Sequence, residues 1–214
     1  MKKKTLLKTT VAGLGLSLLV LGGRKLMVPT YQMVEVFDGD SFLTAEKRSI
    51  RLASINAPEM DKCGGVESKK ALTEYLKGKD IYLKTLYVDE FRRMVSLVYT
   101  KEGLVNELML QTGHAYYTGT ANEPTGISAK AVLAKEKGLG IYGEKCIERV
   151  NPKNKDCKIK GNISLHDKGK AYFRTEECSQ YGNTLIQTYI GDAWFCSIKE
   201  AKEAGFEEAP DCKK

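Results

Sequence analysis

The chain has 214 residues, a length that suits one domain of ordinary size and a smaller second one. Hydrophobic residues make up 42% of the chain, enough to build a core. The formal net charge of +7 favours an anionic partner only weakly, because four of the lysines lie within the first eight residues. His114 and His166 are the only histidines, so the sequence does not support a histidine-based metal cluster or a Ser-His-Asp triad.

The first 23 residues have the pattern of an export signal. Lys2, Lys3 and Lys4 form a basic start, and an uncharged, largely apolar stretch follows from residue 9 to residue 23. A membrane span needs about 20 apolar residues, so this stretch fits a secretory signal better. We expect residues 1–23 to be a signal peptide or an N-terminal membrane anchor, with residues 24–30 as a linker. A buried core helix is the alternative.

The next part of the chain alternates between strand and helix patterns. Alternating or short apolar runs between turn residues predict strands over residues 31–36, 41–45, 47–55, 80–87 and 94–100. Helical spacing predicts helices over residues 67–76, 104–112 and 128–137, the last with Ser128 as its N-cap. Five strands with helices between them fit a small barrel on which helices pack, although strand periodicity alone does not show a barrel.

Three short stretches bring together the residues that bind cations and phosphates. The first, Asp38-Gly39-Asp40, ends the first strand. The second runs from Arg51 in a later strand to the corner Asn56-Ala57-Pro58-Glu59. The third stretch, Asp89-Glu90-Phe91-Arg92-Arg93, precedes another strand. Oxygen-rich turns suit a hard cation, and guanidinium groups suit a phosphate. Each stretch alone is ordinary, as a turn, a surface charge or a helix-entry corner, but their combination favours a site.

These stretches, together with Val105-Asn106-Glu107 at a helix start, resemble the active-site motifs of the thermonuclease (staphylococcal nuclease-like) family. The resemblance covers about residues 31–142 and keeps the order of the motifs. It implies an α+β fold, in which residues 31–148 form a five-stranded OB-fold β-barrel with packed helices. It also implies a calcium-dependent endonuclease that cleaves DNA and RNA with little sequence preference and leaves 3′-phosphates.

The resemblance implies a calcium site with three oxygen ligands. Asp40 matches the family's first metal carboxylate, and the backbone carbonyl of Ala57 stands at the position of another ligand. Asn56 stands where the family usually has a second aspartate. An amide oxygen carries no charge, so we expect weaker calcium binding here.

The resemblance also implies three catalytic side chains. Arg51 and Arg93 match the arginines that grip the phosphate, and Glu59 matches the glutamate that positions or deprotonates the attacking water. Phe91 stands where a tyrosine is common, and Arg92 replaces a glycine. We expect Arg92 to add a cation at the rim and, if both arginines are extended, strand alternation to turn it away from Arg93.

Two adjacent tyrosines are further candidates for substrate binding. Tyr116 and Tyr117 could stack on a base, or could equally be core or rim residues. His114, after Gly113, fits an ordinary structural histidine better than a catalytic one.

The sequence changes character after a polar linker at residues 149–156. Residues 157–214 resemble the small accessory module often found behind bacterial thermonuclease domains, with Ile159-Lys160-Gly161-Asn162 at the start and Trp194-Phe195-Cys196 near the end. We expect a few short strands and one helix in this module, which we call the C-terminal module.

Six cysteines in an exported chain favour disulfides. Zinc held by the four cysteines of the C-terminal module is the alternative, but the sequence contains no Cys-x-x-Cys pair. We prefer a pair within the nuclease domain and internal pairing in the module. The candidate cysteines are Cys63 and Cys146 in the nuclease domain, and Cys157, Cys178, Cys196 and Cys212 in the module.

The leading hypothesis is an exported, monomeric nuclease with DNA and RNA as substrates. It would touch a membrane only if its N-terminal segment is not cleaved. One rival is a non-catalytic OB-fold that binds nucleic acid, and the uncharged Asn56 is the feature that separates the two. Another rival is a cell-surface interaction protein whose C-terminal module binds a partner.

Overall fold

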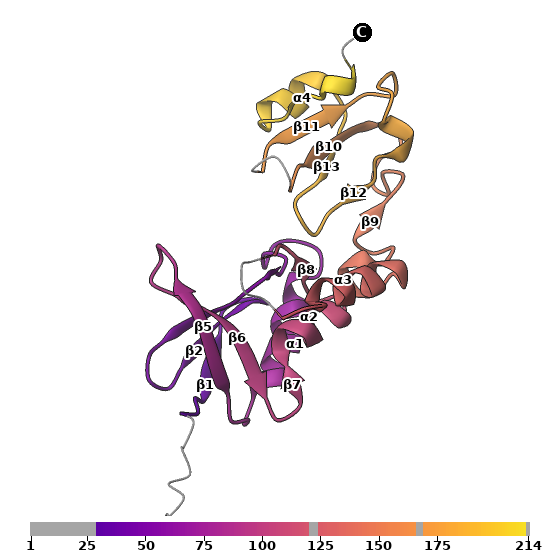
Figure 1. The fold of residues 1–214 in the computed structure, drawn as a ribbon. Coiled ribbons are helices and arrows are strands. Elements are labelled where there is room, and N and C mark those ends of the chain that lie inside the picture. The colour runs from indigo at the N-terminus through magenta and orange to yellow at the C-terminus, as the bar shows by residue number, and fades with distance from the viewer. Residues whose placement is uncertain (1–28, 120–123, 166–168, 213–214) are drawn as a thin grey trace, which may run out of the picture.

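The computed structural model describes residues 29–119, 124–165 and 169–212. The expected signal peptide or anchor lies outside the described residues, as do most of the linker at 24–30 and His166. No helix in the described ranges is long and apolar enough to cross a membrane. In Figure 1 the barrel and the helices beside it occupy the lower part of the view, and the C-terminal module lies above them.

The barrel follows a path of five strands that closes on itself, and the short strand β7 (Gly103–Leu104) adds a sixth by pairing with β6. β3 pairs in parallel with β6, and the other neighbours along the path are antiparallel. Tyr31 and Ile81 exchange backbone hydrogen bonds of 2.8 and 3.1 Å, which join the segments at the two sheet edges. In sheet order the strands are β1 (Met33–Val36), β2 (Ser41–Thr44), β3 (Ser49–Leu52), β6 (Met94–Thr100) and β5 (Tyr82–Val88). The predicted five-stranded OB-type barrel is therefore confirmed.

Three helices cover one side of the barrel (Figure 1). They are α1 (Gly65–Leu76), α2 (Val105–Gln111) and α3 (Ile127–Glu136). Their apolar faces meet the strands in one core, because the apolar residues recur at helical spacing on the helices and at every second position on the strands. Fully buried members of that core are Phe42, Ile50, Leu52, Leu72, Leu76, Leu97, Met109 and Leu110.

Two local predictions were wrong for reasons of backbone geometry. The strand expected over residues 47–55 is interrupted, because Ser54 has a φ of 65° that ends β3 and redirects the chain into β4 (Ile55–Asn56). β4 then pairs with β8 (Tyr116–Tyr117) instead of continuing in the barrel sheet. Helix α3 begins after Gly126, whose φ is 89°, so Ser128 lies inside the helix and is not its N-cap.

The buried side-chain amide of Asn106 connects α2 to β6. The side-chain oxygen of Asn106 accepts a hydrogen bond from the backbone N–H of Val98 at 2.9 Å. Its amide nitrogen donates to the carbonyl of Ala53 at 2.8 Å and to that of Ser96 at 3.3 Å. Asn106 is fully buried, so these bonds have no water to replace them.

We predict that Asn106→Ala lowers the free energy of unfolding by about 2–4 kcal/mol, because it leaves a buried N–H and a buried carbonyl without partners. Denaturant unfolding followed by circular dichroism measures the change. Asn183→Ala is the matched control, since the Asn183 amide makes an exposed hydrogen bond to Gln180. Equal stabilities of the two variants would contradict the structural role of Asn106.

The C-terminal module is a small sheet covered by one helix. The sheet order is β13 (Ala193–Phe195), β10 (Ile159–Ile163), β11 (Ala171–Arg174) and β14 (Glu207–Glu208), and the helix is α4 (Ile198–Glu203). Phe195 and Phe206 meet at 4.9 Å between ring centroids in the core. Gly161 is required beneath them, because a Cβ at that position would lie 2.4 Å from the Phe195 ring. The expectation of short strands and one helix is confirmed.

All six cysteines are in disulfides, which overturns the zinc alternative. Cys63 bonds to Cys146 as preferred, and the module pairs internally through Cys157–Cys196 and Cys178–Cys212. Closing a loop with a sequence separation of 83 stabilises a chain by about 4–5 kcal/mol in the chain-entropy model.

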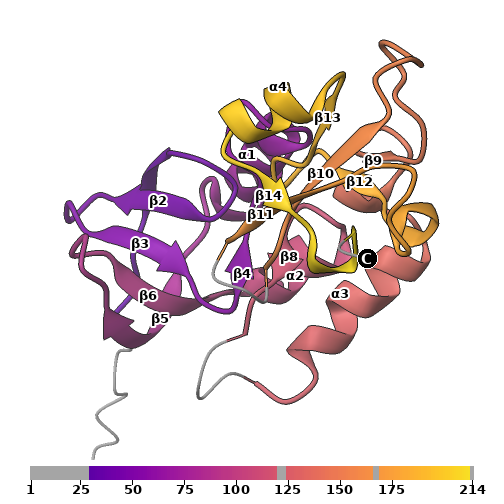
Figure 2. The same ribbon diagram turned by 90° about the horizontal axis from the view of Figure 1, so that it is seen from above.

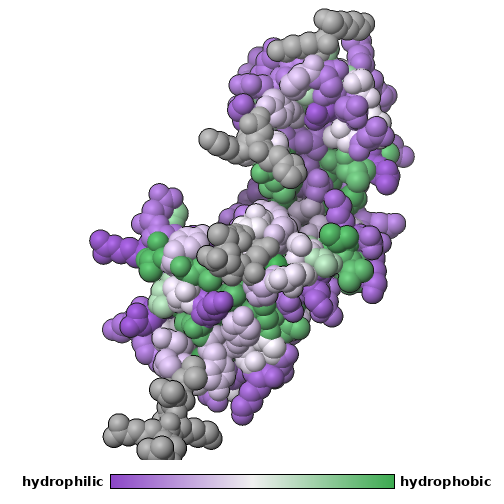
Figure 3. Space-filling model, viewed as in Figure 1, coloured by the Kyte–Doolittle hydropathy of each residue, from purple (hydrophilic) through white to green (hydrophobic). Residues whose placement is uncertain are grey.

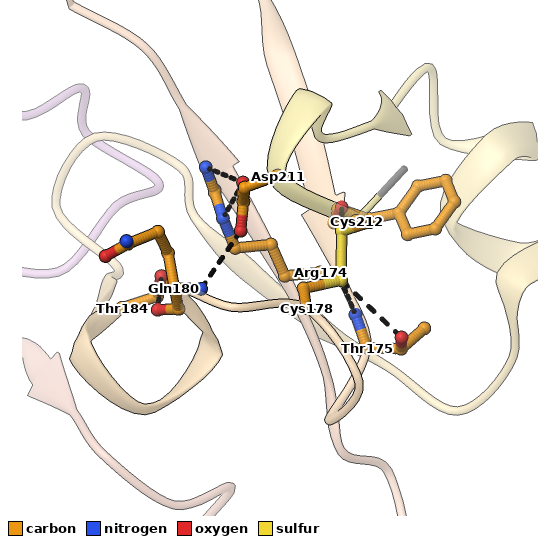
Figure 4. The surroundings of a disulfide bond; sticks show 8 residues. Arg174, Thr175, Cys178, Gln180, Thr184, Asp211 and Cys212 are labelled. Carbon is orange, nitrogen blue, oxygen red and sulfur yellow. Dashed lines mark hydrogen bonds and ion pairs between the residues drawn. A yellow bond between two sulfur atoms is a disulfide. The ribbon is translucent and has the colours of Figure 1, made fainter. Parts of the chain in front are cut away.

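The last disulfide ties the chain's C-terminal segment to the module. Figure 4 shows Asp211 next to the Cys178–Cys212 bond, between the Arg174 guanidinium and the backbone of Gln180. Asp211 accepts from the Arg174 Nε at 2.9 Å and from the Gln180 N–H at 3.1 Å.

The module also pairs with the chain that leaves the barrel. β9 (Ile147–Glu148) and β12 (Ile186–Gln187) form a two-stranded antiparallel ladder beside β10 (Figure 2). Immediately after β12, the Thr188 N–H donates to the Cys146 carbonyl at 3.0 Å.

The remaining short elements are η1 (Gly140–Tyr142), η2 (Tyr181–Asn183) and η3 (Pro210–Cys212).

Candidate active site

One cavity of about 370 Å³ gathers the metal and catalytic candidates of three separate stretches. It lies where the β1–β2 turn, the end of β3, the corner after β4 and the β5–β6 turn meet. The candidates in its lining are Asp40, Arg51, Asn56, Ala57, Glu59 and Arg93. Chain segments more than 50 residues apart therefore contribute to one polar cavity.

Asp40 is held by a tight turn and by bonds to its carboxylate. Its N–H donates to the Asp38 carboxylate at 2.9 Å. Its own carboxylate accepts from the Ala57 N–H at 2.8 Å and pairs with the Arg51 guanidinium at 3.1 Å. Gly39 permits this approach, because a Cβ there would lie 2.5 Å from the Ala57 Cβ.

The environment of Asp40 works against its negative charge. Burial raises the pKa of this carboxyl to about 6, and the nearby Asp38 charge adds to the rise, while Arg51 and the hydrogen bonds from Ala57 and Ser41 oppose it. A divalent cation at these oxygens would favour the ionised form through its own charge.

Arg51 connects Asp40 to Asn56. Besides its ion pair, the guanidinium donates to the Leu52 carbonyl at 3.0 Å and to the side-chain oxygen of Asn56. The Asn56 amide nitrogen in turn donates to the Tyr116 hydroxyl at 3.2 Å. The candidate ligands Asp40 and Asn56 thus share one arginine.

The second arginine is positioned by an aspartate in its own turn. Asp89 accepts from the Arg93 N–H at 2.9 Å and from its Nε at 2.8 Å. Burial opposes ionisation of Asp89, but the hydrogen bonds from Arg93 outweigh it and hold the pKa of Asp89 below its usual value. The Phe91 ring lies 5.3 Å from the Arg93 guanidinium carbon, so Phe91 supports the arginine by a cation–π contact.

Glu59 lies at the exposed rim of the cavity, in a turn that begins the approach to α1. Its carbonyl accepts from the Lys62 N–H at 2.9 Å. Gly65 makes this turn possible, because a Cβ there would lie 2.1 Å from the Glu59 carbonyl oxygen.

Comparison with known proteins agrees with this geometry. The family model described as staphylococcal nuclease homologue matches residues 49–144. An "Uncharacterized endonuclease" of Haemophilus influenzae is 32% identical over 120 residues, which is 54% of this chain and 67% of that protein. The chain belongs to the staphylococcal nuclease family.

Two other relatives are covered to very different shares of their own length. "Probable staphylococcal-like nuclease CAN3" of Oryza sativa is 32% identical over 112 residues, which cover 52% of this chain but 29% of the rice protein. An "Uncharacterized endonuclease" of Escherichia coli is 26% identical over 117 residues, covering 53% of this chain and 76% of that protein.

The oxygen donors of this staphylococcal nuclease family member fit a hard cation. Asp40 offers a carboxylate, Asn56 an amide oxygen and Ala57 a backbone carbonyl at the same cavity, which are ligand types that calcium prefers. No group of three or more His, Cys, Asp or Glu side chains within the described ranges is placed to share a metal ion. The set therefore depends on its amide and backbone oxygens.

Three residues at the cavity were not found by sequence reasoning. Lys62 adds a cation three positions after Glu59, a spacing that marks a turn but gives no functional signal. Tyr189 and Ile190 belong to the C-terminal module, yet they line the same cavity. Only folding brings them to the site.

Of the two tyrosine candidates, only Tyr116 reaches this cavity. Tyr116 also meets Tyr189 at 5.7 Å between ring centroids. Tyr117 packs partly against the barrel core and lines a neighbouring cleft. His114 lies away from the cavity and bonds to the Thr112 hydroxyl at 2.8 Å, as expected of a structural histidine.

Arg92 does not line the cavity. Strand alternation, which we expected to turn it away from Arg93, does not apply because Arg92 lies in a turn. Arg92 has a φ of 61°, in the left-handed region that glycine prefers, and lies exposed in the turn from Asp89 to Arg93. The turn therefore accounts for the glycine that the family resemblance implies at this position.

We predict that Arg92→Gly raises the free energy of unfolding by about 0.5–1 kcal/mol, since glycine adopts this conformation without the steric cost of a side chain. The measurement is denaturant unfolding. Lys137→Gly is the control, because Lys137 is also exposed but has a φ of −85°. Glycine should lower stability there, and a loss of stability in both variants would refute the turn argument.

Proposed function

We propose that this chain is an exported, calcium-dependent endonuclease that hydrolyses phosphodiester bonds of DNA and RNA with little sequence preference and leaves 3′-phosphates. The observation that supports it most is the meeting of two arginines, one exposed glutamate and three oxygen donors at one cavity. Relatives named endonuclease and staphylococcal-like nuclease support the reaction class. Disulfide bonding of all six cysteines supports an oxidising compartment.

Asp40, Asn56 and the Ala57 carbonyl would hold the calcium ion. When bound, calcium supplies positive charge that offsets the charge of the phosphate and of the attacking hydroxide. Because Asn56 is uncharged and already accepts from Arg51, we expect a weaker site than one with two carboxylates.

The arginines would bind the phosphate oxygens. Asp89 fixes the direction of Arg93 through two hydrogen bonds, and Asp40 fixes that of Arg51, so both guanidinium groups are oriented before the substrate arrives. Preoriented donors stabilise the charge that develops on the phosphate oxygens in the transition state.

Glu59 would act on the attacking water. Its place at the exposed rim lets a water approach from solvent, and an ionised carboxylate can accept the proton as the water attacks the phosphorus.

A non-catalytic, nucleic-acid-binding barrel is the second candidate. The observation in its favour is that Arg51 already bonds both side-chain ligands, Asp40 and Asn56. If no metal ion binds there, Arg51, Arg93 and Lys62 can still bind phosphate, but the positive charge that calcium would supply to the reaction is missing.

We predict that Glu59→Gln lowers turnover by about 10²–10⁴ while DNA binding is unchanged, because an amide of equal size cannot accept the proton. Turnover is measured on single-stranded DNA with saturating calcium. Glu46→Gln, at an exposed position outside the cavity, is the control. Turnover equal to that of the parent would remove Glu59 from the reaction.

We predict that Arg93→Lys lowers turnover by about 10²–10³, whereas Arg92→Lys has a mild effect. Lysine keeps the charge but loses the planar fork that binds two phosphate oxygens. Arg92 is the adjacent, equally charged control, since it lies outside the cavity. Turnover is compared after circular dichroism has established folding, and mild effects at both positions would favour the binding-module alternative.

A further inference from the structure

A second cleft of about 420 Å³ continues from the candidate active site toward the C-terminal module. The two cavities share Tyr116, Tyr189 and Ile190 in their linings, so the cleft lies directly beside the candidate active site. β8 and α3 form one wall of the cleft, and β10 with the segment after β12 forms the other. Figure 3 shows hydrophobic side chains gathered at the waist between the two lobes.

The walls of this cleft are apolar and aromatic rather than charged. Val132 on α3 is 55% exposed and Leu165 on the module is 51% exposed, so both are open to a ligand. Lys135 supplies a cation, and none of the described residues that line the cleft is acidic. Gln187 adds an amide that can both donate and accept. The flat faces of nucleobases stack on apolar and aromatic side chains, and their edges form hydrogen bonds with polar groups. This lining therefore suits unstacked nucleobases.

The module wall is fixed in place by several contacts. The ladder of β9 and β12 leads into Thr188, whose N–H donates to the Cys146 carbonyl. Tyr189 is 4% exposed and packs against both Tyr116 and Tyr142, with centroid distances of 5.7 and 5.8 Å. The Cys63–Cys146 disulfide anchors the same junction. A wall held in this way can present a preformed surface to a ligand.

We propose that this cleft binds the unpaired bases next to the scissile phosphate, so that the C-terminal module directs the enzyme to single-stranded nucleic acid. The proposal rests on the proposed function. In a duplex the base faces are stacked and cannot enter a cleft between two walls, whereas the bases of a single strand can turn outward. A peptide could also occupy an apolar cleft, but continuity with a cavity that holds Arg51, Arg93 and Lys62 favours a polyanion.

The test compares two charge-matched double variants of the full chain. Val132→Glu with Leu165→Glu places carboxylates in the cleft, at positions exposed enough to leave the core intact. Val150→Glu with Ile198→Glu is the control, since these residues are 63% and 43% exposed and lie outside the cleft. Circular dichroism establishes that both variants are folded.

Fluorescence anisotropy measures the binding of a labelled eight-nucleotide single strand and of the matching duplex, with a chelator present to prevent cleavage. The parent and the control should bind the single strand about tenfold more tightly than the duplex, as expected from the loss of about one stacked base. The cleft variant should lose this preference without losing affinity for the duplex. Two results would overturn the proposal. The parent could bind the single strand and the duplex equally tightly, or the cleft variant could keep the preference for the single strand, as it would if the cleft binds a peptide.

A second readout separates this proposal from the proposed function. Hydrolysis of a phosphodiester without a nucleobase, methyl 4-nitrophenyl phosphate, with calcium, needs the candidate active site but not the cleft. The cleft variant should hydrolyse it at the rate of the parent. If the parent does not hydrolyse it, the nuclease assignment is refuted. The cleft proposal is decided by the strand preference in the binding assay, which requires no hydrolysis.

Discussion

The buried carboxylate of Asp40 joins three of the segments that form the site, namely the β1–β2 turn, β3 and the corner after β4. It accepts from the Ala57 backbone, pairs with Arg51 and is presented by a turn that Gly39 alone allows at this distance. Burial raises its pKa to about 6, so the charge is maintained at a cost that its partners only partly offset. The same bonds that hold the corner after β4 against the β1–β2 turn also orient the carboxylate oxygens of Asp40 at the cavity.

Asn56 stands where the resemblance to the family implies a second aspartate. Its amide bridges Arg51 and Tyr116, because its oxygen accepts from the guanidinium and its nitrogen donates to the hydroxyl. An aspartate could also bridge the two, since the Tyr116 hydroxyl can donate to a carboxylate. The asparagine therefore keeps this connection without adding a second negative charge beside Asp40, and Tyr116 in turn contacts Tyr189 of the C-terminal module.

Local patterns predicted most of the strands and the three helices, whereas the barrel and the six candidate site residues were inferred from the resemblance to a nuclease family. The structure places all six of those residues at one cavity. Local patterns failed where single backbone angles decide the path, as at Ser54 and Arg92, since side-chain type predicts a left-handed conformation poorly outside glycine. They also missed Tyr189 and Ile190, because no pattern in the module reveals that a segment some 130 residues after Glu59 returns to the same cavity. Such contacts arise from tertiary packing alone.

Whether a bound cation turns this cavity into a catalyst can be measured directly. Purified, disulfide-bonded chain is incubated with supercoiled plasmid DNA in calcium, and in parallel with a chelator, and the products are followed by gel electrophoresis and end-group analysis. A calcium-dependent nuclease predicts nicking and then degradation to fragments with 3′-phosphates in calcium, and intact plasmid with the chelator. Intact plasmid in both, with the DNA still bound, would contradict the nuclease assignment and leave the barrel as a binding module.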